Sequence, residues 1–135
     1  MLEQYAASPL APFIPSTEEI FTTKARQLIG QPAGPGVAHG KVRVIDRPAD
    51  LGRFKFGEIL VCDAVDPTMT FIIPLASAIV ERRGGMLIHG AIIAREYGLP
   101  CVTGIPQVTR TVKTGDVITV DGYLGIVTIG STGTA

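Results

Sequence analysis

The spacing of apolar side chains divides the chain into an N-terminal helical segment and a longer segment rich in strands. Ser16 and Glu19 form a capping box, which predicts a helix start. Apolar side chains then recur at helical spacing up to Gly30; they are Ile20, Phe21, Ala25, Leu28 and Ile29. We therefore expect residues 1–30 to form an extended arm followed by a capped helix, and residues 31–36 to form a linker or tight loop.

The rest of the pattern changes repeatedly between short strands and short helices. The predicted strands are 41–45, 58–62, 78–80, 99–102, 117–120 and 125–129, the last two joined as a hairpin around 121–124. Asp66 and Pro67 are typical of the cap and first residue of a short helix, and residues 89–97 show helical spacing that ends at Gly98. This order predicts an α/β fold with mixed sheet layers and short helices. Residues 131–135 are expected to fray.

The overall charge and hydropathy of the chain narrow the classes of partner. The chain has 135 residues, a length that fits one domain, and its formal net charge is zero. Without a basic field, we expect neither nucleic acid nor an anionic membrane as a partner. The longest apolar stretch, residues 71–80, is interrupted by Pro74 and is too short to span a bilayer. Phe71 and Ile72 in this stretch fit core packing.

Cysteine usage and the N-terminal residues bear on the expected location. Cys62 and Cys101 lie in apolar, strand-like runs, which is typical of reduced core residues. The first residues show no secretory signal, so a cytoplasmic location is expected. Hydrophobic residues make up 46% of the chain, an excess that favours a dense core and a surface for association, with a homo-oligomer as one possibility.

His89 is the candidate for chemistry because it follows Gly84 and Gly85 at the start of the predicted helix. Free N–H groups and the positive end of the helix dipole gather at such a position and suit an anion. The backbone at Gly84, Gly85 and Gly90 is predicted to contact a phosphate, which imidazole, a competent nucleophile, would accept. A structural role remains the alternative, since a lone histidine beside an apolar helix is usually structural.

Three further residues are weaker candidates for this site. Arg95 lies almost two turns along the helix, where an ion pair with Glu81 or Glu96, or packing, is expected. Asp66 is most simply a helix cap, although its loop could help to shape a phosphate pocket. Arg83 could meet a phosphate or a partner, or could end a solvated strand. The chain contains two histidines and no carboxylate cluster at ligand spacing, so no metal site is expected; His39 is expected to be structural or exposed.

The segment Gly84-Gly85-x-x-x-His89-x-Ala91-Ile92-x-Ala94-Arg95-Glu96-x-Gly98-Leu99-Pro100 closely resembles a known family signature. It is the signature of the swivelling phosphohistidine domain of phosphoenolpyruvate-utilising enzymes, such as phosphoenolpyruvate synthase, pyruvate phosphate dikinase and rifampicin phosphotransferase. The segments 34–40, 57–61 and 115–122 resemble the same family. The resemblance implies a β/β/α swivelling domain over residues 31–130, with His89 as the phosphorylated residue.

The resemblance also implies partners, because this chain has no room for a nucleotide-binding or acceptor site of its own. An ATP-grasp subunit or a phosphoenolpyruvate site would supply the phosphoryl group, and a second site would receive it. ATP and Mg would then be bound by a partner, and the chain would be one part of a split phosphotransferase. Leu87 and Ile88 stand where many members carry Ser, Thr or Cys. A non-catalytic scaffold or small-ligand-binding module of the same fold is therefore the alternative.

Overall fold

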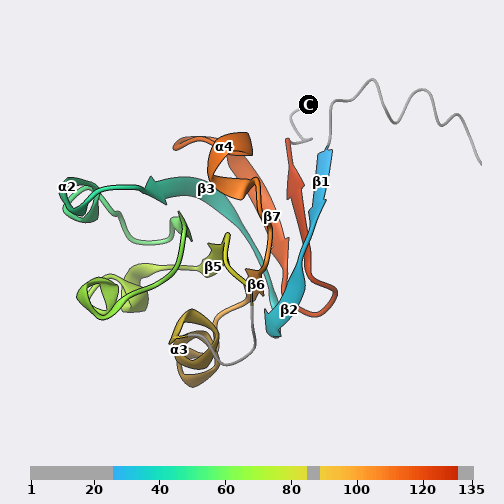
Figure 1. The fold of residues 1–135 in the computed structure, drawn as a ribbon, viewed down its shortest axis with the longest axis horizontal. Helices are drawn as coiled ribbons and strands as arrows, with labels where there is room; N and C mark the ends of the chain where they lie inside the picture. Colours follow the sequence, from blue (N-terminus) through green and yellow to red (C-terminus); the bar gives the residue numbers. More distant parts are fainter. Residues whose placement is uncertain (1–25, 85–88, 131–135) are drawn as a thin grey trace, which may run out of the picture. The chain divides into compact units, whose positions relative to one another are not determined.

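Residues 26–84 and 89–130 are described by the computed structural model of the chain (Figure 1). Residues 26–129 form one unit of eight strands and several short helices. In chain order these elements are β1 (Arg26–Ile29), β2 (Gln31–Gly34), β3 (Val37–Ile45), α2 (Pro48–Leu51), β4 (Ile59–Cys62), η1 (Pro67–Met69), η2 (Ile73–Leu75), β5 (Ala78–Glu81), α3 (His89–Tyr97), β6 (Cys101–Thr103), α4 (Val108–Thr111), β7 (Val117–Asp121) and β8 (Ile126–Ile129). The predicted α/β fold class is confirmed.

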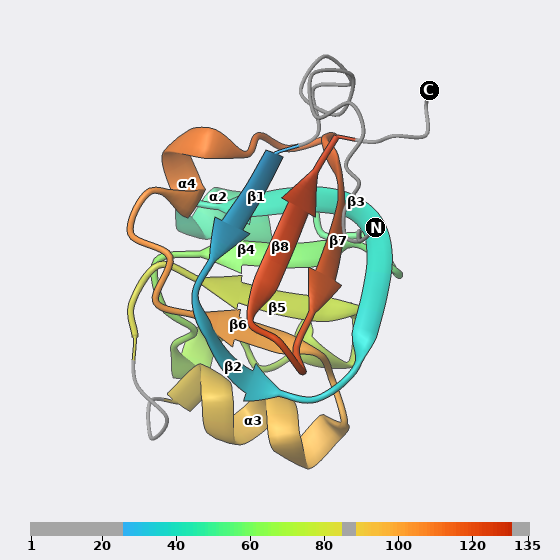
Figure 2. The ribbon, with the colours of Figure 1, turned by 90° about the vertical axis from the view of Figure 1, so that its right-hand side faces the viewer.

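The strands form an antiparallel half and a mostly parallel half that share the long strand β3. Their order is β1-β8-β7-β3-β4-β5-β6-β2. Residues 37–41 of β3 pair antiparallel with β7, whereas residues 42–45 pair parallel with β4. Strands β5 and β6 continue the parallel half, and β2 closes it as an antiparallel edge. Strands β1, β8 and β7 cross in front of β4, β5 and β6, while α3 lies beyond β6 at the lower side (Figure 2).

Two hydrophobic clusters fill the spaces on either side of the parallel strands. Successive side chains of a strand point to opposite faces. On β4, Ile59 and Val61 accordingly join the cluster that the antiparallel strands cover, and Leu60 and Cys62 join the cluster on the helix side. All four side chains are fully buried. This explains why the strand reads as a continuous apolar run, as expected for a strand covered on both faces.

The N-terminal end of the described unit differs from the sequence prediction. The predicted helix over 16–30 is wrong at its C-terminal end, because Arg26–Ile29 form β1 and pair with β8. Leu28 faces the core there while its neighbours are exposed, which is the period of a strand. Ser16 and Glu19 lie outside the described residues, as does the tail over 131–135.

The predicted linker over 31–36 is also wrong for most of its length. Gln31–Gly34 form β2, which pairs with β6 and buries Ala33. Gly30 joins β1 to β2, and a Cβ atom there would lie 2.7 Å from Ile105 and 2.9 Å from Val102. Residues 26–34 therefore supply an edge strand to each half of the sheet. Gly30, between these two strands, allows the chain to pass close to β6.

Most of the remaining predicted elements are confirmed within a few residues. The strands around 41–45, 58–62, 78–80 and 99–102, the hairpin of β7 and β8, and the helix over 89–97 are all present. Asp66 caps η1 by accepting a hydrogen bond from the Thr68 N–H at 2.9 Å. The expectation that Phe71 packs in the core is wrong, since its side chain is 64% exposed.

Cys62 and Cys101 are free and fully buried in the helix-side cluster, as predicted. Burial raises the pKa of the Cys101 thiol to about 12, so it stays protonated at neutral pH. Among the residues that the structure describes, no helix is both long and apolar enough to cross a membrane.

Candidate active site around His89

The C-terminal ends of three parallel strands meet at one edge of the sheet. Register pairs Ile45 of β3 with Cys62 of β4, and Cys62 with Glu81 of β5. The loops that follow these strands therefore begin side by side. In open α/β sheets, this edge is where ligands bind.

His89 is the first residue of helix α3, which lies below β6 in Figure 1. The helix packs on β2, β5 and β6 through a buried face. The buried residues are Gly90, Ala91, Ile93 and Ala94, whereas His89 itself is exposed. The helix ends at Gly98, whose φ of 70° suits glycine. The first N–H groups of a helix have no partner within it, so an exposed imidazole lies beside donors suited to an anion.

Glu81 is a buried carboxylate at this edge, and the sequence analysis did not identify it as a site residue. The side chain is fully buried at the end of β5. Its Oε2 accepts a hydrogen bond from the Val65 N–H at 2.6 Å, and its Oε1 has no hydrogen-bond partner among the described residues. Burial raises the pKa of Glu81 to about 6, and the negative charge of Asp63 adds to the rise.

The carboxylate of Glu81 lies directly against the backbone of Gly90. A Cβ atom at Gly90 would come 2.5 Å from Glu81 Cδ and 2.7 Å from Oε1, and closer still to Oε2. No side chain larger than glycine fits there unless Glu81 moves. Gly90 was predicted to present its backbone to a phosphate; the structure shows that its Cα faces Glu81.

Two arginines precede Gly84 and share one carboxylate. Arg82 and Arg83 each donate from Nε to Asp63, which follows β4; the Arg83 bond is 3.0 Å long. The hydrogen bond from Arg82, with the positive charge of both guanidinium groups, lowers the pKa of Asp63. Arg82 and Arg83 carry two positive charges against the one negative charge of Asp63, so this group of three side chains has a net positive charge. All three side chains are well exposed and accessible to a ligand.

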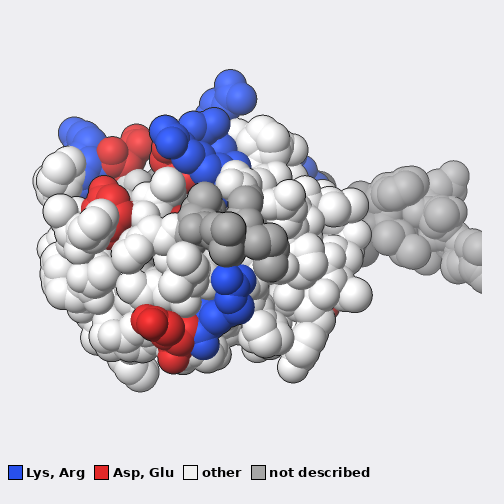
Figure 3. Space-filling model, turned by 60° about the horizontal axis from the view of Figure 1, so that its bottom comes forward, with Lys and Arg blue, Asp and Glu red and all other residues white. Residues whose placement is uncertain are grey.

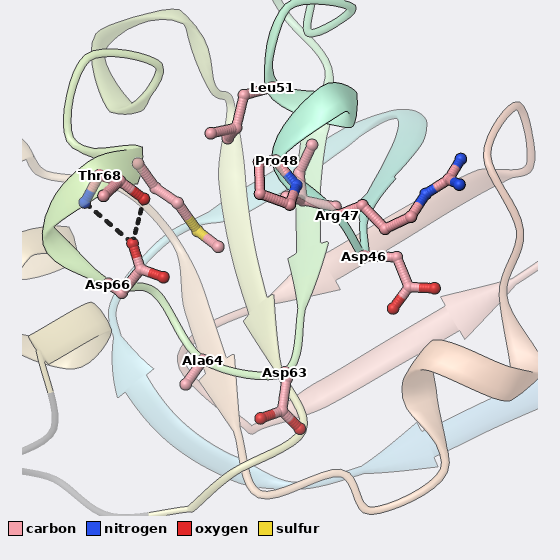
Figure 4. A pocket seen from close by; sticks show the side chains of 10 residues that line it. Asp46, Arg47, Pro48, Leu51, Asp63, Ala64, Asp66 and Thr68 are labelled. Carbon is pink, nitrogen blue, oxygen red and sulfur yellow. Dashed lines mark hydrogen bonds between the residues drawn. The ribbon is translucent and has the colours of Figure 1, made fainter.

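A cavity of about 240 Å³ opens beside Asp63, at the ends of β3 and β4. Pro48 and Leu51 of α2 line one side, and Asp66 and Thr68 line the other (Figure 4). The Arg47 side chain points away from it in this view. Asp66 accepts hydrogen bonds from both the N–H and the hydroxyl of Thr68, so its cap interaction fixes it in the wall of the cavity.

The face that carries α3 shows no extended area of one charge sign. Charged side chains are gathered in small groups of both signs, and most of the visible surface is uncharged (Figure 3). In the described ranges 26–84 and 89–130, no group of three or more His, Cys, Asp or Glu side chains is arranged to hold a metal ion. The chemistry available at this edge is therefore that of an imidazole, two guanidinium groups, carboxylates and backbone N–H groups.

A family model matches the sequence over residues 54–125, which is more than half of the chain. Its description is "PEP-utilising enzyme, mobile domain". The chain belongs to this family. The mobile domain is 39% identical over 114 residues to a probable phosphoenolpyruvate synthase of Pyrococcus horikoshii, covering 83% of this chain and 14% of that protein. It is 41% identical over 102 residues to the uncharacterized phosphotransferase YvkC of Bacillus subtilis, covering 76% of this chain and 12% of that protein.

A solved structure of Enzyme I has the same fold as the mobile domain. The solution structure of that protein superposes with a TM-score of 0.54 and 29% identity, covering 62% of this chain and 35% of the other. The family resemblance found in the sequence is thus confirmed. The chain spans about one seventh or less of the length of the two curated relatives described above.

The remaining candidate residues of the mobile domain lie at different distances from His89. Arg95 is six residues further along α3, about 9 Å along the helix axis, and its Nη1 donates to the Ala33 carbonyl of β2 at 2.9 Å. Glu81, one of the two residues expected to pair with Arg95, accepts its hydrogen bond from the Val65 N–H. Gly84 packs against Gln31 and Gly104. Gly85 lies outside the described residues, as do Leu87 and Ile88.

His39 lies on the antiparallel half, far in sequence from this edge. Its Nδ1 is 2.9 Å from the Thr119 hydroxyl across the β3–β7 pair, and its side chain is exposed. This agrees with the structural or exposed role predicted for it. The mobile domain therefore holds a second histidine in a different setting, which serves as an internal control for His89.

Proposed function

We propose that this mobile domain carries a phosphoryl group on His89 between two sites that other polypeptides or domains provide. The observation that carries the proposal is the exposed side chain of His89 at the first residue of α3, with Arg82 and Arg83 directly after β5. The family membership supports it, as do relatives that are named phosphoenolpyruvate synthase and phosphotransferase.

The transfer would use the lone pair of a neutral ring nitrogen. That nitrogen forms an N–P bond as the P–O bond to the donor breaks, and the electron pair leaves with the donor oxygen. In the second step an acceptor oxygen attacks phosphorus, and the pair returns to the imidazole. Helix N–H groups and the guanidinium groups of Arg82 and Arg83 would offset the negative charge of the phosphoryl group.

The donor and the acceptor belong to partners in this proposal. We propose an ATP-grasp subunit with ATP and Mg, or a subunit that binds phosphoenolpyruvate, as the donor. A second site for pyruvate or another acceptor would receive the group. The domain itself would supply the nucleophile and positive charge, and would relocate between the two sites.

A non-catalytic scaffold or small-ligand-binding module of the same fold is the alternative. It predicts a histidine packed against apolar side chains, because such a protein has no use for an accessible ring. The exposure of His89 favours the carrier, and so does the positive charge of Arg82 and Arg83 at the end of β5. The cavity beside Asp63 is the feature that a small-ligand-binding module would use.

Labelling tests the carrier directly. The chain is supplied with an ATP-grasp partner and labelled ATP, or with a phosphoenolpyruvate-binding partner and labelled phosphoenolpyruvate. We expect label that is stable to alkali and labile to acid, present in the wild type and in His39→Ala but absent from His89→Ala. Label that persists in His89→Ala would overturn the proposal.

A further inference from the structure

The buried carboxylate of Glu81 has no role in the transfer chemistry described above. A carboxylate removed from water is normally paired with a cation or fully hydrogen-bonded. Glu81 has one backbone donor, Val65 N–H, while its Oε1 has no partner in the described part of the chain. Such a group gives up few interactions when it binds a proton, because burial costs less free energy for the neutral carboxyl than for the carboxylate.

Within the described part of the chain, the hydrogen bond that Glu81 accepts comes from the Val65 N–H and not from a cationic side chain. On β4 the neighbour is Cys62, followed by Asp63, which is already paired with Arg82 and Arg83. On β6, which pairs Cys101 with Ile79, the titratable group that interacts electrostatically with Glu81 is the protonated thiol of Cys101. Helix α3 presents Gly90 to it, with His89 just before and Arg95 two turns away, where Arg95 Nη1 bonds to Ala33. A change of charge at His89 is therefore a change that could alter the protonation of Glu81.

Glu81 and His89 approach the start of α3 from opposite sides. The carboxylate lies against Gly90 from within the core, and the imidazole projects from the adjacent residue into solvent. Adjacent Cα atoms are about 3.8 Å apart, so the backbone of His89 lies directly next to the residue that Glu81 contacts. The partial positive charge at the start of α3 would attract both the carboxylate and a phosphoryl group.

We propose that Glu81 binds a proton from solvent when His89 is phosphorylated, so that the phosphohistidine and the neutral carboxyl stabilise each other. The physical reason is repulsion, since a phosphoryl group adds between one and two negative charges at the helix start. The proposal rests on the proposed function of His89. By linkage the effect is reciprocal, so acid pH favours the phosphorylated state.

The pH range in which the coupling acts follows from the direction in which phosphorylation shifts the pKa of Glu81. Without phosphate, Glu81 titrates with a pKa of about 6. A nearby negative charge moves its pKa upward, so the coupling acts between about pH 6 and the higher value in the phosphorylated state. Neutral pH lies at this boundary. Phosphorylation near pH 7 would then take up part of a proton, and transfer to the acceptor would release it.

A charge placed at position 89 by mutation tests the coupling without any partner. The titration midpoint of Glu81 is measured from the ¹³C shift of its carboxyl carbon in His89→Glu and in His89→Gln, and is assigned with Glu81→Gln. We expect a midpoint higher by roughly one pH unit in His89→Glu. The matched pair His39→Glu and His39→Gln controls for charge elsewhere and should leave the midpoint unchanged. Equal midpoints in the two His89 variants would overturn the proposal.

Phosphorylated protein gives the second test. In a His39→Gln chain treated with phosphoramidate, ³¹P NMR follows phosphohistidine while the Glu81 carboxyl is titrated. A raised midpoint supports the coupling, whereas an unchanged midpoint in phosphorylated protein refutes it. If no partner ever labels His89 but the His89→Glu and His89→Gln midpoints differ, the carrier function fails and the electrostatic coupling stands.

Discussion

Gly90 and Glu81 are packed so closely that the size of one limits the other. The Cα of Gly90 faces a fully buried carboxyl group, and a Cβ atom would overlap it. This contact gives Gly90 a structural reason to be glycine that is independent of any phosphate. It also predicts that substitutions at the two positions are energetically coupled.

Gly90→Ala is expected to lower the free energy of unfolding by about 3 kcal/mol, because the new methyl group displaces a carboxyl group that has no other space. In a Glu81→Ala background the same substitution should cost little, since the overlap is gone and alanine is the better helix former. Urea denaturation of the four proteins gives the coupling free energy. Gly52→Ala is the control, because nothing lies within 4 Å of a Cβ there and φ is −71°. A loss from Gly90→Ala that is unchanged without Glu81 would contradict this packing.

Glu81 also predicts a pH dependence of stability. Its pKa is about 6 in the folded chain and 4.5 in its ordinary state, so the folded chain holds the proton more tightly. The contribution to stability is complete below about pH 4.5 and is lost as pH rises through 6. The full effect is about 2 kcal/mol.

Glu81→Gln removes this titration. The stability of the variant relative to the wild type should therefore rise by about 2 kcal/mol between pH 4.5 and 7. Denaturation at several pH values measures the difference in free energy of unfolding between the variant and the wild type. The other carboxylates, including Asp63 with its lowered pKa, contribute to both proteins and largely cancel. A difference that stays constant across this range would show that Glu81 does not titrate as the structure indicates.

At the scale of elements, periodicity identified the strands that are buried on both faces. The apolar run Ile59–Cys62 is short, contains the β-branched residues Ile59 and Val61, and follows Gly57, which together favour a buried strand over a helix. Strand β1 was missed for the opposite reason. Leu28 and Ile29 fit either period, and the choice depends on pairing with β8, about one hundred residues away in the sequence. No local pattern carries that information.

The site shows the same division between local and distant signals. His89 could be identified from the sequence because two glycines, a histidine and a predicted helix start lie within six residues of one another. Glu81 ends an apolar strand, where a charged residue usually marks the exit to solvent, and the sequence gives no sign that the chain returns over it. Its burial depends on the Gly90 backbone and on the Val65 N–H, which only the folded chain brings together.

At the scale of the whole unit, the two hydrophobic clusters are joined by the strands between them. Side chains of β4 and β5 alternate from one cluster to the other, so Ile59 belongs to the cluster under the antiparallel strands and Ile79 to the cluster under the helices. Strand β3 likewise pairs with both halves of the sheet. Neither half can lose its packing without exposing one face of the shared strands.

This arrangement predicts one cooperative unfolding transition that includes the site. Ile59→Val and Ile79→Val each remove one buried methylene and should each cost about 1 kcal/mol. Both variants should shift the urea midpoints of far-UV circular dichroism and of tyrosine fluorescence by the same amount, because all probes follow one equilibrium when a unit unfolds in a single transition. If Ile79→Val moved only one of the two signals, the helix layer would unfold separately. A single midpoint for both signals would mean that α3 unfolds only together with the rest of the unit.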